Sequence, residues 1–278
     1  MTGDTKTTSD IIFRLENVLE DQSSVKPISP LMAMRTFAWR SVLKIKHVPE
    51  QLIDAVLFPV LFTLMFTFVF GGAIAGSPEN YLQFTLPGIL AQTVVFLTIY
   101  TAINVNTDIS KGALDRFRTM PVWRPAHPVG ALLADWLRYG IAAALCLVVG
   151  IIIGYRAEGG VAGVITAMGL LLVFSFALSW MWLVVGLKVR TATAVQGISF
   201  VILFPLTFVS SVYAPPETMP EWLQAFVNIN PRTFLADAVR GLMSGTVDGT
   251  SVVMVLVVSA IITVVFAPIA LWVYNNLD

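Results

Sequence analysis

A short charged segment, residues 111–121, has the residue types and spacing most suggestive of a functional site, which would be a site for docking a partner. Asp115 and Arg118 lie three residues apart, so they can bridge on one face of a helix, while Leu114 and Phe117 share another face. A proline then ends the helix after about two turns. The spacing leaves two interpretations open: an apolar knob that docks into a soluble partner, or a loop that only sets membrane topology.

The chain lacks the motifs of several enzyme classes. It has no Gly-x-x-x-x-Gly-Lys-Ser/Thr phosphate loop and no Gly-x-Ser-x-Gly motif, which argues against ATP binding through such a loop and against a serine hydrolase. The only histidines are His47 and His127, and the single cysteine is Cys146, so we expect no metal site. We therefore expect a protein that is not an enzyme and holds no cofactor of its own.

Composition places these residues in a membrane protein. The 278 residues are 56% hydrophobic and 12% charged, with a mean hydropathy of +0.80. A soluble domain carries about 25% charged residues, and a span of about 20 apolar residues crosses the hydrocarbon core. By that measure the chain has six predicted spans: residues 53–74, 82–105, 138–154, 161–187, 192–212 and 252–274.

Loop charges predict the orientation. Lysines and arginines gather before the first span, in the loop after the second, where Arg138 is counted, and after the fourth. The other side carries Arg156, Arg232 and Arg240. Because cytoplasmic loops carry the excess of cations, we expect a multi-pass protein of the cell membrane with both termini cytoplasmic. Total charge is balanced at 17 cations and 17 anions, and we expect no nucleic-acid partner.

The expected fold is all-α and divides into three parts. Residues 1–27 form a cytoplasmic tail, which is either a short surface helix or a segment that folds on contact. Residues 28–50 mix apolar and basic positions and predict a helix in the cytoplasmic interface. Residues 51–278 form the six-span domain. Within it, residues 214–245 are too polar to cross, and their helical spacing predicts two re-entrant helices on the outer side before the last span.

Carboxylates bear on the energy source. Ion-coupled transport normally leaves carboxylates in mid-span. Asp54, Asp108 and Asp135 are all expected at the cytoplasmic ends of spans, so the energy source is expected elsewhere.

Five stretches resemble the type 2 ABC exporter permeases, specifically the daunorubicin-resistance (DrrB-like) group, in order and at the expected spacing from about Pro30 to the C-terminus. They are Phe84–Leu90, Asn106–Val122, Ala131–Arg138, Glu217–Phe226 and Asn230–Gly241.

The resemblance implies a half-transporter, in which two permease subunits, identical or related, meet a pair of ABC ATPase subunits that hold ATP and Mg. The segment 111–121 then contains the coupling helix, docked on the ATPase through Leu114, Asp115, Arg116, Phe117, Arg118 and Met120. The implied function is export of a hydrophobic or amphipathic compound (a drug, polyketide or complex lipid) out of the cytoplasm or inner leaflet. An ion-gradient-driven secondary transporter and a non-transporting scaffold are the alternatives.

Two polar stripes are candidates for the substrate path. One face of the fifth span carries Gln196, Ser199, Thr207 and Ser210. The first span adds Thr63, Phe66, Thr67 and Phe70. Hydroxyls and amides mixed with aromatic rings suit an amphipathic, largely apolar substrate. Small and hydroxyl residues are also common where membrane helices pack, so packing is the competing interpretation.

Overall fold

The computed structural model describes residues 29–47, 49–112 and 125–276, except the side chains of residues 44–56. All regular elements in these ranges are helices, as predicted. They are α2 (Pro30–His47), α3 (Pro49–Met65), the π-helix η1 (Phe66–Phe70), α4 (Gly71–Ala75), α5 (Pro78–Leu97), α6 (Ile99–Ser110), α8 (Ala126–Ile153), α9 (Gly160–Lys188), α10 (Ala192–Phe208), the 3-10 helix η2 (Pro216–Thr218), α11 (Glu221–Ile229), α12 (Pro231–Ser244) and α13 (Gly249–Asn275).

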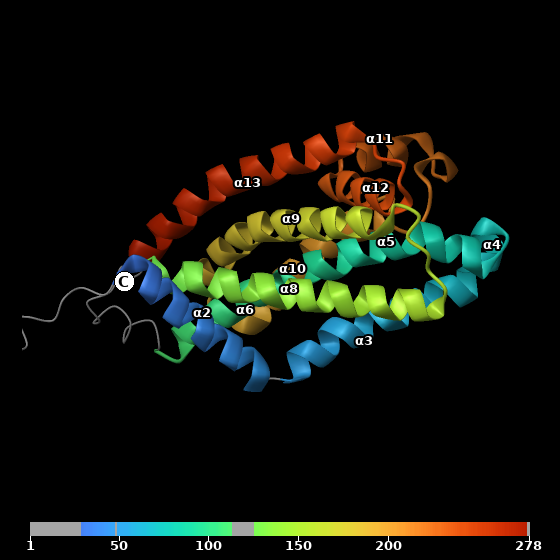
Figure 1. The fold of residues 1–278 in the computed structure, drawn as a ribbon. Coiled ribbons are helices and arrows are strands. Elements are labelled where there is room, and N and C mark those ends of the chain that lie inside the picture. Colours follow the sequence, from blue (N-terminus) through green and yellow to red (C-terminus); the bar gives the residue numbers. More distant parts are fainter. Residues whose placement is uncertain (1–28, 48, 113–124, 277–278) are drawn as a thin grey trace, which may run out of the picture.

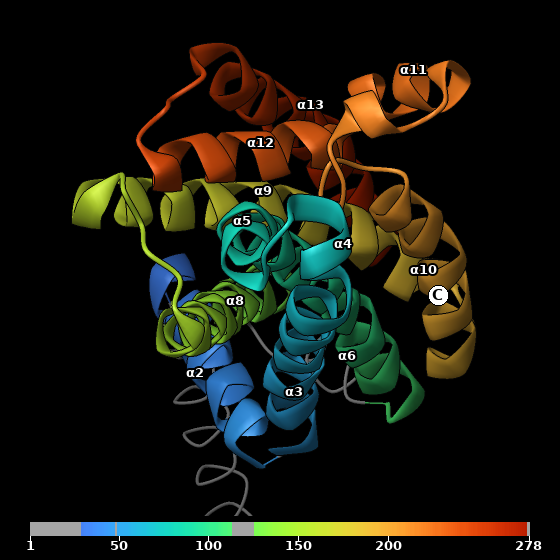
Figure 2. The same cartoon turned by 90° about the vertical axis from the view of Figure 1, so that its right-hand side faces the viewer.

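The helices form an elongated bundle (Figure 1). Helix α2 and the C-terminal end of α13 lie at one end, and α4 and α11 lie at the other. The view along the bundle in Figure 2 places α5 among α8, α9, α3 and α6. Burial agrees, because most residues of α5 are buried, whereas α13 is mostly exposed. The core is therefore built around α5.

Among the described residues, five helical stretches are long and apolar enough to cross a membrane: Leu57–Ala75, Pro78–Ser110, Ala126–Ile153, Gly160–Lys188 and Gly249–Asn275. They correspond to five of the six predicted spans. The predicted fifth span forms α10, which at 17 residues is shorter than these and contains Pro205. The third span was predicted to start at Arg138, whereas the helix that contains it, α8, begins at Ala126 and runs unbroken through the charged residues.

Helix α5 is fixed at its start and extended at its end. Ser77 is its N-cap, with its hydroxyl accepting from the backbone N–H of Asn80, and Pro78 occupies the first turn. At the other end Thr98 is the one residue between α5 and α6, and its hydroxyl donates to the carbonyl of Val95 at 2.6 Å. The α5–α6 unit thus runs from Pro78, beside α4, to Ser110, next to the segment predicted to dock a partner.

Two predicted helical segments outside the spans are present. Helix α2 lies within residues 28–50 and packs on α8. That approach is close, since a Cβ on Gly130 would lie 2.7 Å from the Cβ of Phe37. Residues 214–245 contain both predicted helices, of which α12 packs on α5, α9 and α13 and α11 lies more exposed.

Candidate functional site

A cavity of about 510 Å3 lies among α3, α5, α6 and α10. Its walls are largely aromatic and aliphatic, with the amides of two glutamines. The lining residues are Phe58, Pro59, Phe62, Ile89, Gln92, Thr93, Phe96, Leu97, Ile99, Tyr100, Ile103, Gln196, Phe200, Phe204 and Phe208. Apolar walls with a few polar groups are typical of small-molecule sites, so this cavity, called the aromatic pocket below, is the candidate binding site.

Helical spacing builds the aromatic walls. On α10, Phe200, Phe204 and Phe208 recur every fourth residue, so they lie on one face, with ring centroids 5.1 and 4.5 Å apart. On α3, Phe58 and Phe62 repeat this spacing, with centroids 4.8 Å apart. The pocket is therefore suited to a flat or chain-like apolar body with a few polar groups.

The eight residues predicted for the substrate path do not gather in this pocket. Gln196 lines it. Phe66 instead stacks on Tyr213 with centroids 4.2 Å apart, and Phe70 is half exposed. The remaining residues, all buried hydroxyls outside the lining, are Thr63, Thr67, Ser199, Thr207 and Ser210.

The buried hydroxyls mostly serve their own helices. Thr63 donates to the carbonyl of Pro59 at 2.8 Å, and Ser210 donates to the carbonyl of Thr207. Within the described part of the chain, the hydroxyls of Thr67 and Ser199 have no hydrogen-bond partner. Along α10, the residues that line the pocket and the hydroxyl residues that are buried in helix packing are thus different.

A polar network closes the end of the pocket nearest α11 and α12. The Tyr213 hydroxyl donates to Oε1 of Gln92, and the Tyr81 hydroxyl donates to the Tyr213 carbonyl at 2.8 Å. Beside it, Arg232 is 4% exposed and donates through Nη1 to Oγ1 of Thr207. Its guanidinium carbon lies 5.7 Å from the ring centroid of Phe96, which lines the pocket.

A second buried network joins α6, α8 and α9, and it corrects the sequence analysis. Arg138 was counted in a cytoplasmic loop, but it is buried inside α8, where it forms an ion pair at 2.7 Å with Asp135, which is also buried. Oδ2 of Asp135 accepts from Thr101 on α6 at 2.6 Å. Tyr139 bridges onward, 2.8 Å from Thr101 and 3.0 Å from Ser179 on α9.

The opposite ends of α6 and α8 also meet. Nε2 of His127, at the start of α8, lies 3.7 Å from Oδ2 of Asp108 near the end of α6. The His127 ring contacts Phe37 of α2 edge-on at 5.4 Å and stacks near Tyr274 of α13 at 6.1 Å. The two helices flanking residues 113–124 are thus joined at two levels. The predicted docking residues Leu114, Asp115, Arg116, Phe117, Arg118 and Met120 lie outside the described residues.

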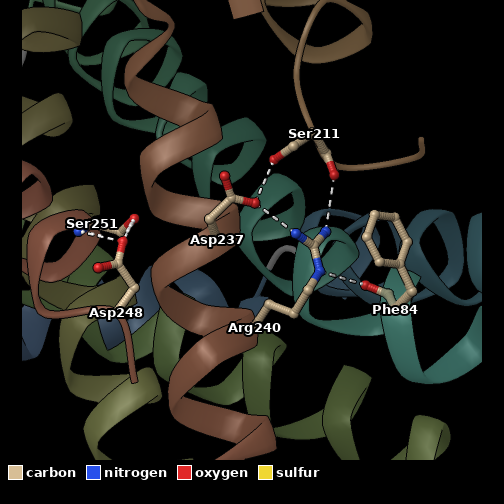
Figure 3. Close-up of polar contacts among 6 residues, drawn as sticks. All are labelled: Phe84, Ser211, Asp237, Arg240, Asp248 and Ser251. Carbon is tan, nitrogen blue, oxygen red and sulfur yellow. Dashed lines mark hydrogen bonds and ion pairs between the residues drawn. The ribbon is translucent and has the colours of Figure 1, made fainter. Parts of the chain in front are cut away.

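A third cluster fixes α12 (Figure 3). Arg240 donates to Asp237 at 2.6 Å, to the carbonyl of Phe84 at 3.0 Å and to the carbonyl of Ser211 at 2.9 Å. The Ser211 hydroxyl donates to the same oxygen of Asp237 at 2.7 Å, and the guanidinium lies 3.9 Å from the Phe84 ring centroid. The ion pair of Asp237 and Arg240 thus has a structural role, joining α12 to α5 and to the chain after α10.

Comparison with known proteins places the chain in context. The family model described as ABC-2 type transporter matches residues 32–244. The daunorubicin resistance ABC transporter permease protein DrrB1 of Streptomyces coeruleorubidus is 45% identical over 99% of this chain and 97% of its own length. The probable doxorubicin resistance permease DrrC of Mycobacterium tuberculosis is 25% identical over 79% of this chain and 80% of its own. The putative transport permease ycf38 of Cyanophora paradoxa is 26% identical over 84% of this chain and 83% of its own length.

Proposed function

Because the chain belongs to the ABC-2 type transporter family, we propose that it is the membrane permease subunit of an ATP-driven exporter of hydrophobic or amphipathic compounds. The observation that carries this proposal is the similarity, over nearly the whole chain, to a permease named for daunorubicin resistance. ATP and Mg would be held by a pair of separate ABC ATPase subunits, and a second permease subunit, identical or related, would complete the pore. Both termini would be cytoplasmic.

The aromatic pocket supports the cargo class. Its rings come from four different helices, and the amides of Gln92 and Gln196 add isolated polar groups. An aromatic or long-chain compound would exchange lipid for ring contacts there, while the amides would orient its polar groups. This makes the pocket the proposed cargo site.

The contacts of α6 suggest how ATP hydrolysis would reach the cargo. The segment around Phe117 and Arg118, which we propose as the coupling helix, follows α6 directly in sequence, and Tyr100 and Ile103 of α6 line the pocket. The Thr101–Asp135 hydrogen bond and the His127–Asp108 contact join α6 to α8. A push on the coupling helix would therefore move α6 and α8 together and displace one wall of the pocket.

The alternative function, an ion-gradient-driven secondary transporter, would need a carboxylate in a membrane helix for a proton relay, and the buried Asp135 is the candidate for it. Its contacts with Arg138 at 2.7 Å and with the Thr101 hydroxyl at 2.6 Å favour a structural role for this carboxylate, which joins α8 to α6. We therefore favour the ATP-driven exporter.

The test isolates the tagged full chain from native membranes in a mild detergent. It compares wild type with the Phe117→Ala/Arg118→Ala double variant and with Arg124→Ala, a cation of the same loop outside the docking set. We expect an ATPase with a phosphate loop to co-purify with wild type and Arg124→Ala, and to be lost from the double variant. Inside-out vesicles should take up daunorubicin on addition of ATP.

Two results would overturn the proposal. One is the absence of any ATPase from the wild-type preparation. The other is daunorubicin uptake driven by a proton gradient without ATP, which would establish the secondary transporter. Co-purification that is equal in the double variant would remove only the docking assignment of Phe117 and Arg118.

A further inference from the structure

Two buried arginines lie behind the aromatic pocket. The guanidinium carbon of Arg138 lies 5.2 Å from the ring centroid of Tyr100, and that of Arg232 lies 5.7 Å from the ring centroid of Phe96. Both rings line the pocket, four residues apart on the α5–α6 unit. Each ring is therefore in cation–π contact with a buried guanidinium.

The two arginines differ in how their charge is compensated. Arg138 has Asp135 at 2.7 Å. Arg232 donates to the neutral hydroxyl of Thr207, and within the described residues its Nη2 has no hydrogen-bond partner and no carboxylate forms an ion pair with it. Asp237 of the same helix bonds to Arg240 and Ser211 instead. Arg232 is thus a buried cation without a matching anion in this part of the chain.

The position of Arg232 adds to its positive potential. It lies in the first turn of α12, where the helix dipole is positive, and it is 4% exposed. A desolvated cation is costly unless an anion or several acceptors compensate it. The energetically favoured partner for this end of the pocket is therefore an anionic oxygen.

The pocket lining offers donors and no competing charge. None of its lining residues is Asp, Glu, Lys or Arg. Oε1 of Gln92 accepts from Tyr213, and the N–H groups of the same amide can donate to a ligand. In a site of low dielectric the field of Arg232 reaches past the Phe96 ring with little screening.

We infer that the Arg232 end of the pocket binds the anionic oxygen head group, a carboxylate or a phosphate, of an amphiphile whose apolar body lies among Phe62, Phe200 and Phe204. This inference rests on the proposed cargo site and adds a preference for acidic amphiphiles, which bind more tightly there than neutral or cationic compounds such as daunorubicin. Phe96 lines the pocket and its ring centroid lies 5.7 Å from the guanidinium carbon of Arg232, so the guanidinium acts on the head group through its field. Arg232 is then a specificity-determining residue.

The test measures binding to the purified full chain in phosphatidylcholine nanodiscs by energy transfer from tryptophan to pyrene. The probes share one apolar body: 1-pyrenebutyrate, 1-pyrenebutanol and 1-pyrenebutyltrimethylammonium, each corrected for partition into empty discs. Wild type should bind the acid about tenfold tighter than the alcohol and bind the ammonium compound most weakly.

Variants assign the effect to one residue. Arg232→Met should bind the acid and the alcohol equally, Arg232→Lys should keep part of the preference, and the exposed Arg156→Met should keep all of it. Equal binding of the three probes by wild type overturns the inference, as does an undiminished preference in Arg232→Met. If Arg232→Met does not fold, the inference is tested by the relative affinities of wild type for the three probes and by the reduced acid preference expected of Arg232→Lys.

A second arm identifies the source of the anion. Discs containing phosphatidylglycerol should leave acid binding unchanged if the site takes free acidic cargo, and should reduce it if a lipid phosphate occupies the site. Both results require the anion site, whereas absence of acid binding in every disc overturns it. This assay contains no ATPase and no ion gradient, so it tests the anion site alone. The anion site can therefore be absent while the exporter proposal holds, and it can be present while the ATPase co-purification test fails.

Discussion

Asp135 and Arg138 form a 2.7 Å ion pair inside α8, and the side chains of both are almost completely buried. The pair lies on one helical face, and Asp135 continues it to α6 through the hydroxyl of Thr101. Arg138 in turn stacks over Tyr100, which lines the pocket. One ion pair thus connects the helix before residues 113–124, the helix after them and the wall of the candidate cargo site.

Breaking this pair should destabilise the protein strongly. Arg138→Met leaves the buried carboxylate of Asp135 without its cation, a loss of about 3–5 kcal/mol. Thermal unfolding of the purified chain should show a large drop in Tm, while the exposed Arg156→Met, the same chemical change, should have little effect. The double variant Asp135→Leu/Arg138→Met should recover part of the loss, since it buries no charge. A wild-type Tm for Arg138→Met alone would contradict this account.

The approach of α6 to α9 depends on Gly186. A Cβ at that position would lie 2.5 Å from the carbonyl oxygen of Ala102, a backbone atom that no rotamer change can move. Gly186→Ala should therefore force the helices apart and destabilise the protein by about 1–3 kcal/mol. Gly169 on the same helix has open space at its Cβ, so Gly169→Ala should be neutral or mildly stabilising. The Tm values of the two variants check this, and equal values would contradict it.

Much of the fold could be predicted from run length and loop charge, because these respond directly to the membrane. Five spans lie where the apolar runs are. The start of α8 could not be predicted in this way, because the charged residues Asp135 and Arg138 indicated the end of a loop and not the interior of a helix. Within the helix they neutralise each other three residues apart, so α8 continues past them. The three-residue spacing of Asp135 and Arg138 was the feature of the sequence that could have indicated an ion pair within one helix. Nothing in the sequence analysis anticipated the π-helix η1.

The candidate site was harder to predict, because it depends on how four helices meet. Of the predicted polar stripe, Gln196 lines the pocket, whereas the hydroxyl residues are buried outside its lining. The aromatic face of Phe200, Phe204 and Phe208 has an equally regular spacing and was the better signal. Gln92 and Phe96 could not be singled out, since their part in the pocket follows from the central position of α5.

The start of α13 should respond to pH through Asp248. Its carboxylate accepts from the backbone N–H groups of Thr250 and Ser251 at 3.1 Å, and from the Ser251 hydroxyl at 2.6 Å (Figure 3). These hydrogen bonds, that of the Ser251 hydroxyl foremost, hold the pKa of Asp248 below its usual value. A lowered pKa in the folded state means stability that is present above the unfolded pKa and lost as pH falls through the folded pKa.

The measurement is Tm against pH for wild type and Asp248→Asn, which keeps a neutral cap. Wild type should be more stable by a constant margin at neutral pH, and the margin should shrink below about pH 4, near the ordinary carboxyl pKa. Ser251→Ala should show a smaller margin of the same sign, because it removes only the hydroxyl bond. A margin that widens on acidification would contradict the assignment.

Gln196 and Ser199 test the difference between lining and packing on a single helix. Gln196 lines the aromatic pocket, whereas Ser199 is fully buried with its hydroxyl unpaired within the described residues. Gln196→Leu should change the relative export of polar and apolar cargo, because it replaces one of two amides in an apolar cavity, a difference of about 0.5–1.5 kcal/mol or a few-fold in rate. Ser199→Ala removes a hydroxyl with no bond to lose, so export and Tm should stay near wild type. ATP-driven uptake of two fluorescent compounds by inside-out vesicles, normalised to expression, measures both. Equal changes in both variants would mean that cargo follows the hydroxyl stripe and not the aromatic pocket.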